Sequence, residues 1–226
     1  MKRLLGIAAI LVVLASPARA TRLNPAFELE GGAGLVTVSD RYPSDETALW
    51  RPSLGLGFTL GSAPDARLAF RTGLLYRRTL TARRLDWASG PGIEYRDVMR
   101  ANELRLPARL SWAPGAGRFA IEGGVVGTYV LRATSEVEYD GSLLTPTRPA
   151  SPEAIIFMPF SGERDITDFV RRGNASVTAA LRWTGRFSGR AMQLHARYEH
   201  GLLNVTTATG YDERARAILL GASLYW

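Results

Sequence analysis

Apolar and polar residues alternate with a period of two along most of this chain. The alternation is clear near its end, where every second residue is apolar: Ile218, Leu220, Ala222, Leu224 and Trp226. The residues between them are mostly small or polar. Such alternation predicts a β-strand with one apolar face. Because no residue follows Trp226 to cover that face, we expect this strand to lie against lipid.

Seven other stretches show the same alternation, so the sequence predicts eight strands. In the clearest of them, 103–112, Glu103, Arg105 and Arg109 share one face and leucines occupy most of the other. The expected strands are 27–35, 53–60, 68–77, 103–112, 119–131, 177–183, 192–199 and 218–226.

The connections between these strands alternate in length. Three tight turns are expected at 61–65, 114–117 and 184–189. Four longer loops are expected at 39–47, 86–97, 140–165 and 204–212. Outer-membrane barrels have short turns on the periplasmic side and long loops outside the cell. The spacing therefore favours a barrel of that kind over a β-sandwich or a propeller.

The polar face carries many glycines among its arginines and glutamates, which helps to decide which face is inside. A soluble lipocalin-type barrel has the same alternation but buries its apolar face. The interior of an eight-stranded barrel is only wide enough for side chains to fill. An inward arginine on one strand therefore needs a small residue opposite, as offered by Gly32, Gly34, Gly55, Gly57, Gly73, Gly124 and Gly221. This favours charges inside and apolar residues outside.

Aromatic residues fall at two levels of the apolar face. Those beside the short turns are Trp112, Phe119, Trp183 and Trp226, and those further along are Tyr76, Tyr129 and Tyr198. The ten-residue interval from Phe119 to Tyr129 is roughly 25 Å of height in a tilted strand, which matches the apolar band of outer-membrane barrels. The sequence thus predicts an all-β fold, an eight-stranded antiparallel up-and-down transmembrane β-barrel.

One turn also predicts a register. If Trp112 pairs with Phe119 across the turn, Arg109 lies opposite Glu122 on the inner face. Charges removed from water need partners, so we expect an ion pair between these two side chains inside the barrel.

The first twenty residues have the features of a secretory signal peptide. Lys2 and Arg3 precede an apolar run, and Ala18 and Ala20 form a small-x-small cleavage site. The apolar run is too short for a membrane-spanning helix. We therefore expect residues 1–20 to be removed and residues 21–226 to form a single barrel domain.

Composition narrows the range of functions. The chain has no cysteine, which excludes disulfides, thiol catalysis and cysteine-ligated metals. Its net charge is +7, and loss of Lys2, Arg3 and Arg19 with the signal peptide leaves +4. In an exported protein this arginine excess favours contact with anionic lipid headgroups over nucleic acid.

Three segments carry a resemblance to a known family. ELRLPARLSW (103–112), LHARYEHGLLNV (194–205) and the terminal ILLGASLYW (218–226) resemble the PorT-like "porin family" of outer-membrane β-barrel domains, which are related in shape to small OmpA/OmpX-type barrels. The resemblance implies the barrel fold and a bacterial outer-membrane location. No open pore is expected, because arginines crowd an eight-stranded lumen and plug it.

The final residues resemble a second feature of outer-membrane barrels. Such proteins typically end on an aromatic residue that the outer-membrane assembly machinery recognises. This resemblance implies that Tyr225 and Trp226 form the C-terminal assembly signal, with that machinery as a partner.

The two histidines are the candidate catalytic residues. His195 is predicted to face the lumen beside Arg197 and Glu199 as part of a polar network. His200 falls on the outer face near the extracellular rim, where a lipid-modifying enzyme would place a base. Lipid A deacylases place a serine two residues after that histidine, whereas Leu202 stands there in this chain. We therefore expect no catalytic residue.

Two features concern the extracellular side. The predicted loop 140–165 contains the apolar run 154–160, which either packs over the barrel or offers a contact site for an extracellular protein or surface. Arg214 and Arg216 lie on the same alternating positions as the outward-facing apolar residues of this strand, beyond the apolar band. Because arginine suits phosphate, we expect both to contact lipopolysaccharide.

The sequence therefore favours a small outer-membrane barrel with a structural or surface-interaction role through its extracellular loops. We expect no enzyme activity, cofactor or metal site, and no nucleic-acid partner. Two alternatives remain open: an outer-membrane lipid-modifying enzyme centred on His200, and a soluble periplasmic ligand-binding barrel.

Overall fold

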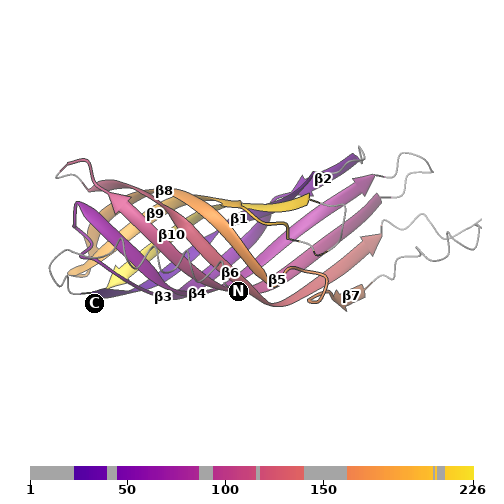
Figure 1. Cartoon of the computed structure of the whole chain (residues 1–226), viewed down its shortest axis with the longest axis horizontal. Helices are drawn as coiled ribbons and strands as arrows, with labels where there is room; N and C mark the ends of the chain where they lie inside the picture. Colours follow the sequence, from indigo (N-terminus) through magenta and orange to yellow (C-terminus); the bar gives the residue numbers. More distant parts are fainter. Residues whose placement is uncertain are drawn as a thin grey trace, which may run out of the picture.

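The computed structural model describes residues 23–39, 45–86, 94–115, 118–139, 162–205, 207 and 212–226. Eight long strands form the barrel, and β2 and β7 are short additions at one end (Figure 1). The strands are β1 (Asn24–Ser39), β2 (Asp45–Leu49), β3 (Arg51–Gly61), β4 (Leu68–Asp86), β5 (Glu94–Trp112), β6 (Phe119–Tyr139), β7 (Gly162–Asp165), β8 (Gly173–Phe187), β9 (Arg190–Gly201) and β10 (Asp212–Tyr225).

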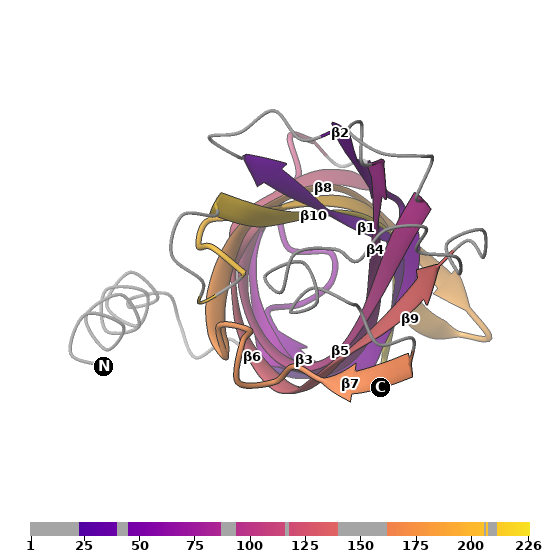
Figure 2. The same cartoon turned by 90° about the vertical axis from the view of Figure 1, so that its right-hand side faces the viewer.

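The eight long strands close into a ring. Each pairs antiparallel with the long strands before and after it in the chain, and β1 pairs with β10 to complete the circle. Figure 2 shows this closed ring from its end. The predicted up-and-down antiparallel barrel is thus confirmed. In the described part of the chain, no helix is long and apolar enough to cross a membrane.

The ring has a stagger of ten residues. Paired residues followed once around the barrel from Pro25 return to β1 at Leu35, through Leu60, Thr72, Ala108, Val125, Val177, His200 and Arg216. Ten residues of stagger over eight strands correspond to a strand tilt of about 40°. Such a barrel has a lumen that side chains can fill completely.

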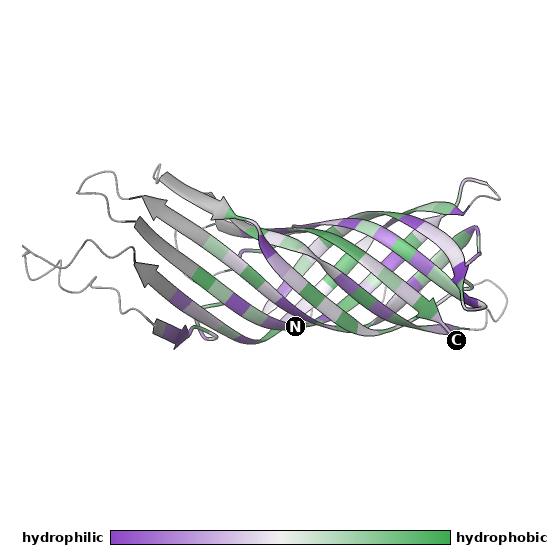
Figure 3. Cartoon of the chain, turned by 180° about the vertical axis from the view of Figure 1, so that it is seen from behind, coloured by the Kyte–Doolittle hydropathy of each residue, from purple (hydrophilic) through white to green (hydrophobic). Residues whose placement is uncertain are grey.

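Apolar side chains cover the outside of the barrel, and charged side chains fill the inside. Leu106 on β5 is 62% exposed, whereas its neighbour Arg105 is 0% exposed. Figure 3 shows apolar and polar residues alternating along the coloured strands that face the viewer. This is the reverse of a soluble ligand-binding barrel, so that alternative is wrong. The outer surface is suited to lipid.

Three short turns lie at one end, which we call the turn end; the opposite end is the loop end. Asn24 and Tyr225, the outer limits of β1 and β10, also lie at the turn end. Ser188 and Gly189 form a two-residue turn with φ of 49° and 79°, as hairpins with a right-handed twist require. The predicted turn at 184–189 was therefore too long, since β8 continues to Phe187.

The predicted register across the β5–β6 turn is wrong. Trp112 pairs with Ile121, and Phe119 pairs instead with Trp183 on β8. Arg109 consequently lies opposite Gly124. The turn holds more residues than the expected pairing allowed.

Three of the predicted long loops are partly strand, including 140–165, where β7 spans Gly162–Asp165. In the expected loop 39–47, β2 begins at Asp45 and pairs with β4, so that Leu49 lies opposite Ala82. In the expected loop 86–97, β5 begins at Glu94. The apolar run 154–160 lies outside the described residues, as does the predicted signal peptide 1–20.

The barrel wall is uneven at the loop end. β8 begins at Gly173, opposite Tyr129, whereas β6 continues to Tyr139. Two segments fill this low part of the wall: residues 166–172, between β7 and β8, and residues 202–205, after β9. The backbone N–H of Arg171 in the first donates to the carbonyl of Val205 in the second at 2.7 Å. Val170 from the first segment packs against Ala101, Val130 and Ala133. An apolar cluster thus lies above the charged lumen.

Candidate functional site

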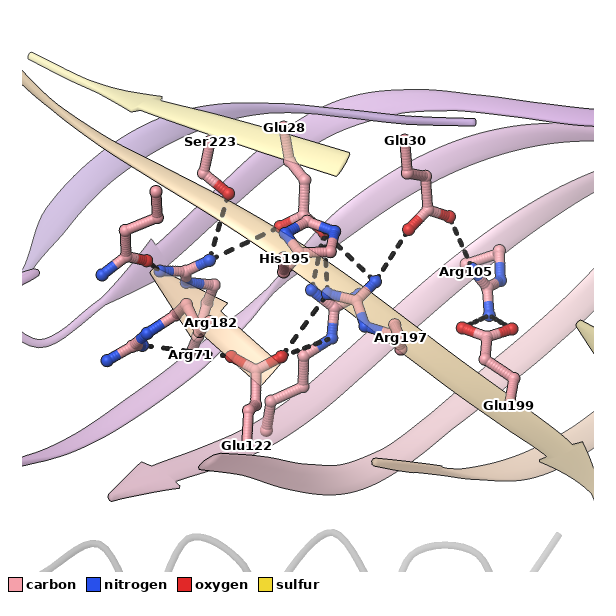
Figure 4. Close-up of polar contacts among 12 residues, drawn as sticks. Glu28, Glu30, Arg71, Arg105, Glu122, Arg182, His195, Arg197, Glu199 and Ser223 are labelled. Carbon is pink, nitrogen blue, oxygen red and sulfur yellow. Dashed lines mark hydrogen bonds and ion pairs between the residues drawn. The ribbon is translucent and has the colours of Figure 1, made fainter. Parts of the chain in front are cut away.

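The barrel lumen holds a connected network of charges (Figure 4). All of its side chains are buried or nearly so, and they come from six of the eight long strands. Its arginines are Arg71, Arg77, Arg105, Arg109, Arg182 and Arg197, and its glutamates are Glu28, Glu30, Glu103, Glu122 and Glu199. Each faces inward because it alternates with an apolar neighbour on the outer face.

The part nearer the loop end, which we call the upper ion group, is balanced in charge. It consists of Arg77, Arg105, Arg197, Glu30, Glu103 and Glu199. Arg105 donates to Glu30 at 2.7 Å and to both oxygens of Glu199 at 2.6 and 2.5 Å. Arg77 reaches Glu199 at 2.9 Å. Three positive charges therefore meet three negative ones at short distances.

The part nearer the turn end, the lower ion group, has one positive charge too many. It consists of Arg71, Arg109, Arg182, Glu28 and Glu122. Only Arg109 makes a short contact, at 2.6 Å to Glu28. Arg71 lies 3.8 Å from Glu28, and Arg182 lies 4.0 Å from Glu122. Arg197 joins the two groups through Glu28 and Glu122, each at 3.4 Å.

The two residues expected to form the interior pair are both in this group. Arg109 Nε lies 4.0 Å from Glu122 Oε1, at the outer limit of an ion pair. The closer partner of Arg109 is Glu28, whose strand β1 lies across the lumen from β5. This contact could not be predicted from the pairing of adjacent strands, because β1 and β5 are not neighbours in the ring.

Polar side chains close the network at the turn end. Arg71 donates to Ser223 at 3.1 Å and also contacts Gln193 and Tyr225. The Tyr225 hydroxyl donates to Gln193 Oε1 at 2.6 Å, and Gln193 Nε2 donates to the carbonyl of Pro64 at 2.9 Å. The β3–β4 turn is thereby held across the barrel mouth.

The last two residues point in opposite directions. Tyr225 is buried in the lumen, whereas Trp226 is 57% exposed on the outer surface. The ring of Trp226 packs edge-on against Phe58, with ring centroids 6.0 Å apart. Of the two residues assigned to the assembly signal, only Trp226 presents its side chain outside the folded barrel.

His195 lies inside the lower part of the network. Its Nε2 is 3.9 Å from Glu28, and the ring occupies space left by Gly221. A Cβ at position 221 would stand 2.3 Å from that nitrogen. The network thus depends on a glycine opposite a bulky inward side chain, as the sequence predicted for this kind of barrel.

Glu28, Glu30 and His195 have potential ligand atoms within 4.8 Å of one another. A metal ion does not fit there, because arginines already contact both carboxylates. Their guanidinium groups would repel a cation in a setting with little water to screen the charges.

His200 lacks the neighbours that hydrolysis would need. It is paired with Val177 on β8 and Arg216 on β10. Ser176, beside Val177, lines the interior cavity instead. Leu202 occupies the position where a deacylase-like motif has serine. Neither a nucleophile nor an acid accompanies His200 among its paired residues.

Arg214 and Arg216 are exposed on the outer face of β10, in line with Ile218 and Leu220. They therefore lie at the loop-end border of the apolar surface. At the end of β7, also on the loop-end side, Thr167 donates to Asp165 through both its backbone N–H and its hydroxyl. These hydrogen bonds lower the pKa of the Asp165 carboxyl.

No family model and no curated protein matches this chain, so the PorT-like and "porin" resemblance stays a prediction. Among solved structures it is similar to Ail, the attachment invasion locus protein of Yersinia pestis, in complex with the heparin analogue sucrose octasulfate (12% identity, TM-score 0.41, 89% of this chain and 99% of that one). It is also similar to Neisserial surface protein A (10%, 0.43, 89% and 99%) and to OprG from Pseudomonas aeruginosa (11%, 0.35, 91% and 95%).

The arrangement of exposed and buried residues in the barrel indicates the environment in which it folds. An apolar exterior, a charged interior, short turns at one end and longer connections at the other are the features of bacterial outer-membrane barrels. The chain is accordingly an outer-membrane protein.

Proposed function

We propose that this chain is a non-enzymatic outer-membrane barrel with a structural and surface-interaction role. The observation that carries the proposal is the luminal network, in which buried arginines and glutamates join strands from all sides of the ring. A lumen filled in this way braces the wall and leaves little room for transport. Function is then left to the two ends and the outer surface.

The loop end is the part that meets extracellular partners. β4, β5 and β6 project beyond the low wall at β8 and β9, and β2 and β7 extend this projection on its two sides (Figure 1). Loops on a rigid scaffold commonly carry binding function. The partner is an extracellular protein or surface, and no cofactor or nucleic acid takes part.

The outer surface also contacts lipopolysaccharide. Arg214 and Arg216 stand at the border of the apolar surface on β10, where lipid phosphates lie in the outer leaflet. Guanidinium groups form paired hydrogen bonds with phosphate oxygens. These two side chains therefore anchor the barrel at its loop end.

Export and insertion complete the proposal. Residues 1–20 direct secretion and are removed, and residues 21–226 form the barrel domain. Trp226 is the exposed part of the C-terminal signal read by the assembly machinery, which is consistent with its place on the outer surface at the turn end.

Single-cysteine labelling tests location and orientation together, because the sequence contains no cysteine and each introduced thiol is therefore the one that reacts. Asp168→Cys places an exposed thiol between β7 and β8 at the loop end, and Ser188→Cys places one on the β8–β9 turn. A membrane-impermeant maleimide should label Asp168→Cys on intact cells and Ser188→Cys only after the outer membrane is permeabilised. Labelling of both on intact cells, or recovery of the protein in the soluble fraction, would contradict the proposal.

A further inference from the structure

A cavity of about 510 Å³ lies at the turn end of the barrel. Its walls come from the β3–β4 turn, from residues 113–115 and 118 beside β5 and β6, and from the start of β6, with Arg182 and Thr184 of β8 also lining it. The cavity at the loop end measures only about 70 Å³, less than half of the roughly 150 Å³ that holds a benzene molecule. Of these two cavities, only the one at the turn end has the size of a ligand pocket.

The turn-end cavity is strongly basic. Arg67, Arg118 and Arg182 line it, and Asp65 is the one carboxylate among its lining residues. No acidic side chain in the described part of the chain pairs with Arg67 or Arg118. The lining therefore carries two positive charges in excess.

Arg182 adds a buried positive charge to the exposed arginines of the cavity. Its side chain is 3% exposed, and its nearest acid, Glu122, is 4.0 Å away. Its Nε has no hydrogen-bond partner among the described residues. Arg182 also belongs to the lower ion group, which has three arginines for two glutamates. A buried cation with incomplete pairing is costly unless an anion supplies the missing partner.

The pocket is held in shape by backbone hydrogen bonds. The carbonyl of Arg67 accepts from Ala113 at 2.8 Å, and the carbonyl of Arg118 accepts from Thr184 at 2.7 Å. Gln193 fixes Pro64 in the same turn. The backbone positions of the two exposed arginines are therefore set before any ligand binds, which lowers the entropy lost on binding.

We propose that this pocket binds the phosphate group of a small soluble phosphate monoester. Guanidinium groups match phosphate oxygens with paired hydrogen bonds, and the net charge of the lining matches a dianion. Pro64 and Pro114 supply apolar surface for the organic part of the ligand. That the ligand arrives from the periplasm rests on the proposed function, whereas the chemistry of the pocket does not.

The test is titration calorimetry on the mature chain in an uncharged detergent, with glycerol 3-phosphate as the probe and glycerol as the blank. We expect saturable binding of the phosphate ester alone. Arg67→Ser and Arg118→Ser should each weaken it by about tenfold or more, since each removes a charge-assisted hydrogen bond. Arg186→Ser and Arg190→Ser are the controls, because they remove exposed arginines of the β8–β9 turn that do not line the pocket.

Arg182→Gln adds a test of the buried contact, and heat-modifiable gel migration shows whether each variant is folded. If Arg182→Gln does not fold, the two exposed arginines still decide the outcome. Absence of saturable binding, or equal weakening by the two control variants, would overturn the proposal.

A second arm separates a soluble ester from a lipid headgroup. Bicelles containing phosphatidic acid should compete no better than glycerol 3-phosphate at equal phosphate concentration. Strong competition by the lipid alone would identify a headgroup site and reject the soluble ligand. Because all of these measurements use detergent or bicelles, they report on the pocket independently of the cysteine labelling that tests membrane orientation.

Discussion

Arg105 on β5 and Glu199 on β9 meet across the lumen, although two strands, β6 and β8, separate them in the ring. One guanidinium nitrogen of Arg105 lies 2.6 and 2.5 Å from the two carboxylate oxygens. Both side chains are buried. The contact therefore holds opposite parts of the wall at a fixed separation, a role that hydrogen bonds between neighbouring strands cannot fill.

Removal of one charge from this pair should destabilise the barrel. Glu199→Gln leaves Arg105 and Arg77 short of a partner and should lower the free energy of unfolding by about 3–5 kcal/mol. Urea unfolding in lipid vesicles, followed by tryptophan fluorescence, measures the change. Glu163→Gln on exposed β7 is the matched control and should have almost no effect. Equal stabilities for the two variants would mean that the luminal network does not brace the wall.

Gly221 should not tolerate a side chain. Gly221→Ala places a methyl group 2.3 Å from His195 Nε2 and 2.8 Å from the carbonyl oxygen of Leu29, so the ring or the backbone must move. Overpacking of this kind costs about 1–3 kcal/mol. Gly123→Ala is the control, because its Cβ points outward and meets only Thr178 O at 3.8 Å. The same unfolding assay should show a loss for the first variant and little change for the second.

A charge placed on the outer surface should destabilise the barrel more, the deeper it lies in the membrane. Leu220 lies on β10 between Trp226 at the turn end and Arg216 near the loop end, so Leu220→Arg puts a charge within the apolar band. Arginine near the bilayer midplane costs about 2–4 kcal/mol, and near an interface about 0–1 kcal/mol. Leu202→Arg at the loop end is therefore the control. A soluble barrel would accept both changes equally.

Lipopolysaccharide retention should depend on the two rim arginines of β10. Arg214→Ala combined with Arg216→Ala removes the guanidinium groups at the border of the apolar surface. We expect less lipopolysaccharide to copurify with the barrel, as quantified on silver-stained gels. The matched double variant, Arg186→Ala with Arg190→Ala, removes two exposed arginines at the turn end and should retain the wild-type amount. Unchanged retention in the β10 double variant would reject the contact.

The last two residues should have separable effects. Trp226→Ala should reduce the fraction of protein inserted into the outer membrane, measured as the heat-modifiable band from cells. Tyr225→Phe removes the hydroxyl that bonds to Gln193 and should lower stability by about 1–3 kcal/mol once the barrel is inserted. If Tyr225→Phe blocks insertion as strongly as Trp226→Ala, the lumen-facing side chain is also read during assembly.

The strands could be predicted, and so could the side of the barrel wall on which each side chain lies, because both follow from the local alternation of apolar and polar residues. Each arginine of the network has an apolar neighbour that fixes its side of the wall, as Arg105 has in Leu106. The inward positions that have no room for a side chain could likewise be recognised, because glycine occupies them, as at Gly221. These properties need no knowledge of which strands are opposite one another.

The partners inside the lumen could not be predicted in the same way. They depend on the stagger of the whole ring, which brings Glu28 on β1 to Arg109 on β5. The β5–β6 turn also differed from the expected register, and this moved Arg109 opposite Gly124. One of these contacts could have been predicted. Gln193 and Tyr225 both alternate onto the inner face at the turn end, where the buried Arg71 needs hydrogen-bond acceptors.

The projection formed by β4, β5 and β6 leaves two strand edges beyond the closed ring. Unpaired edges invite pairing with another chain and hence aggregation. Here β2 covers β4 from Ala82 to Asp86, and β7 covers β6 from Thr134 to Val137. The outer edges are then those of β2 and β7 themselves, which have only five and four residues. Edge strands this short offer little backbone for a neighbouring copy to pair with, which limits edge-to-edge association.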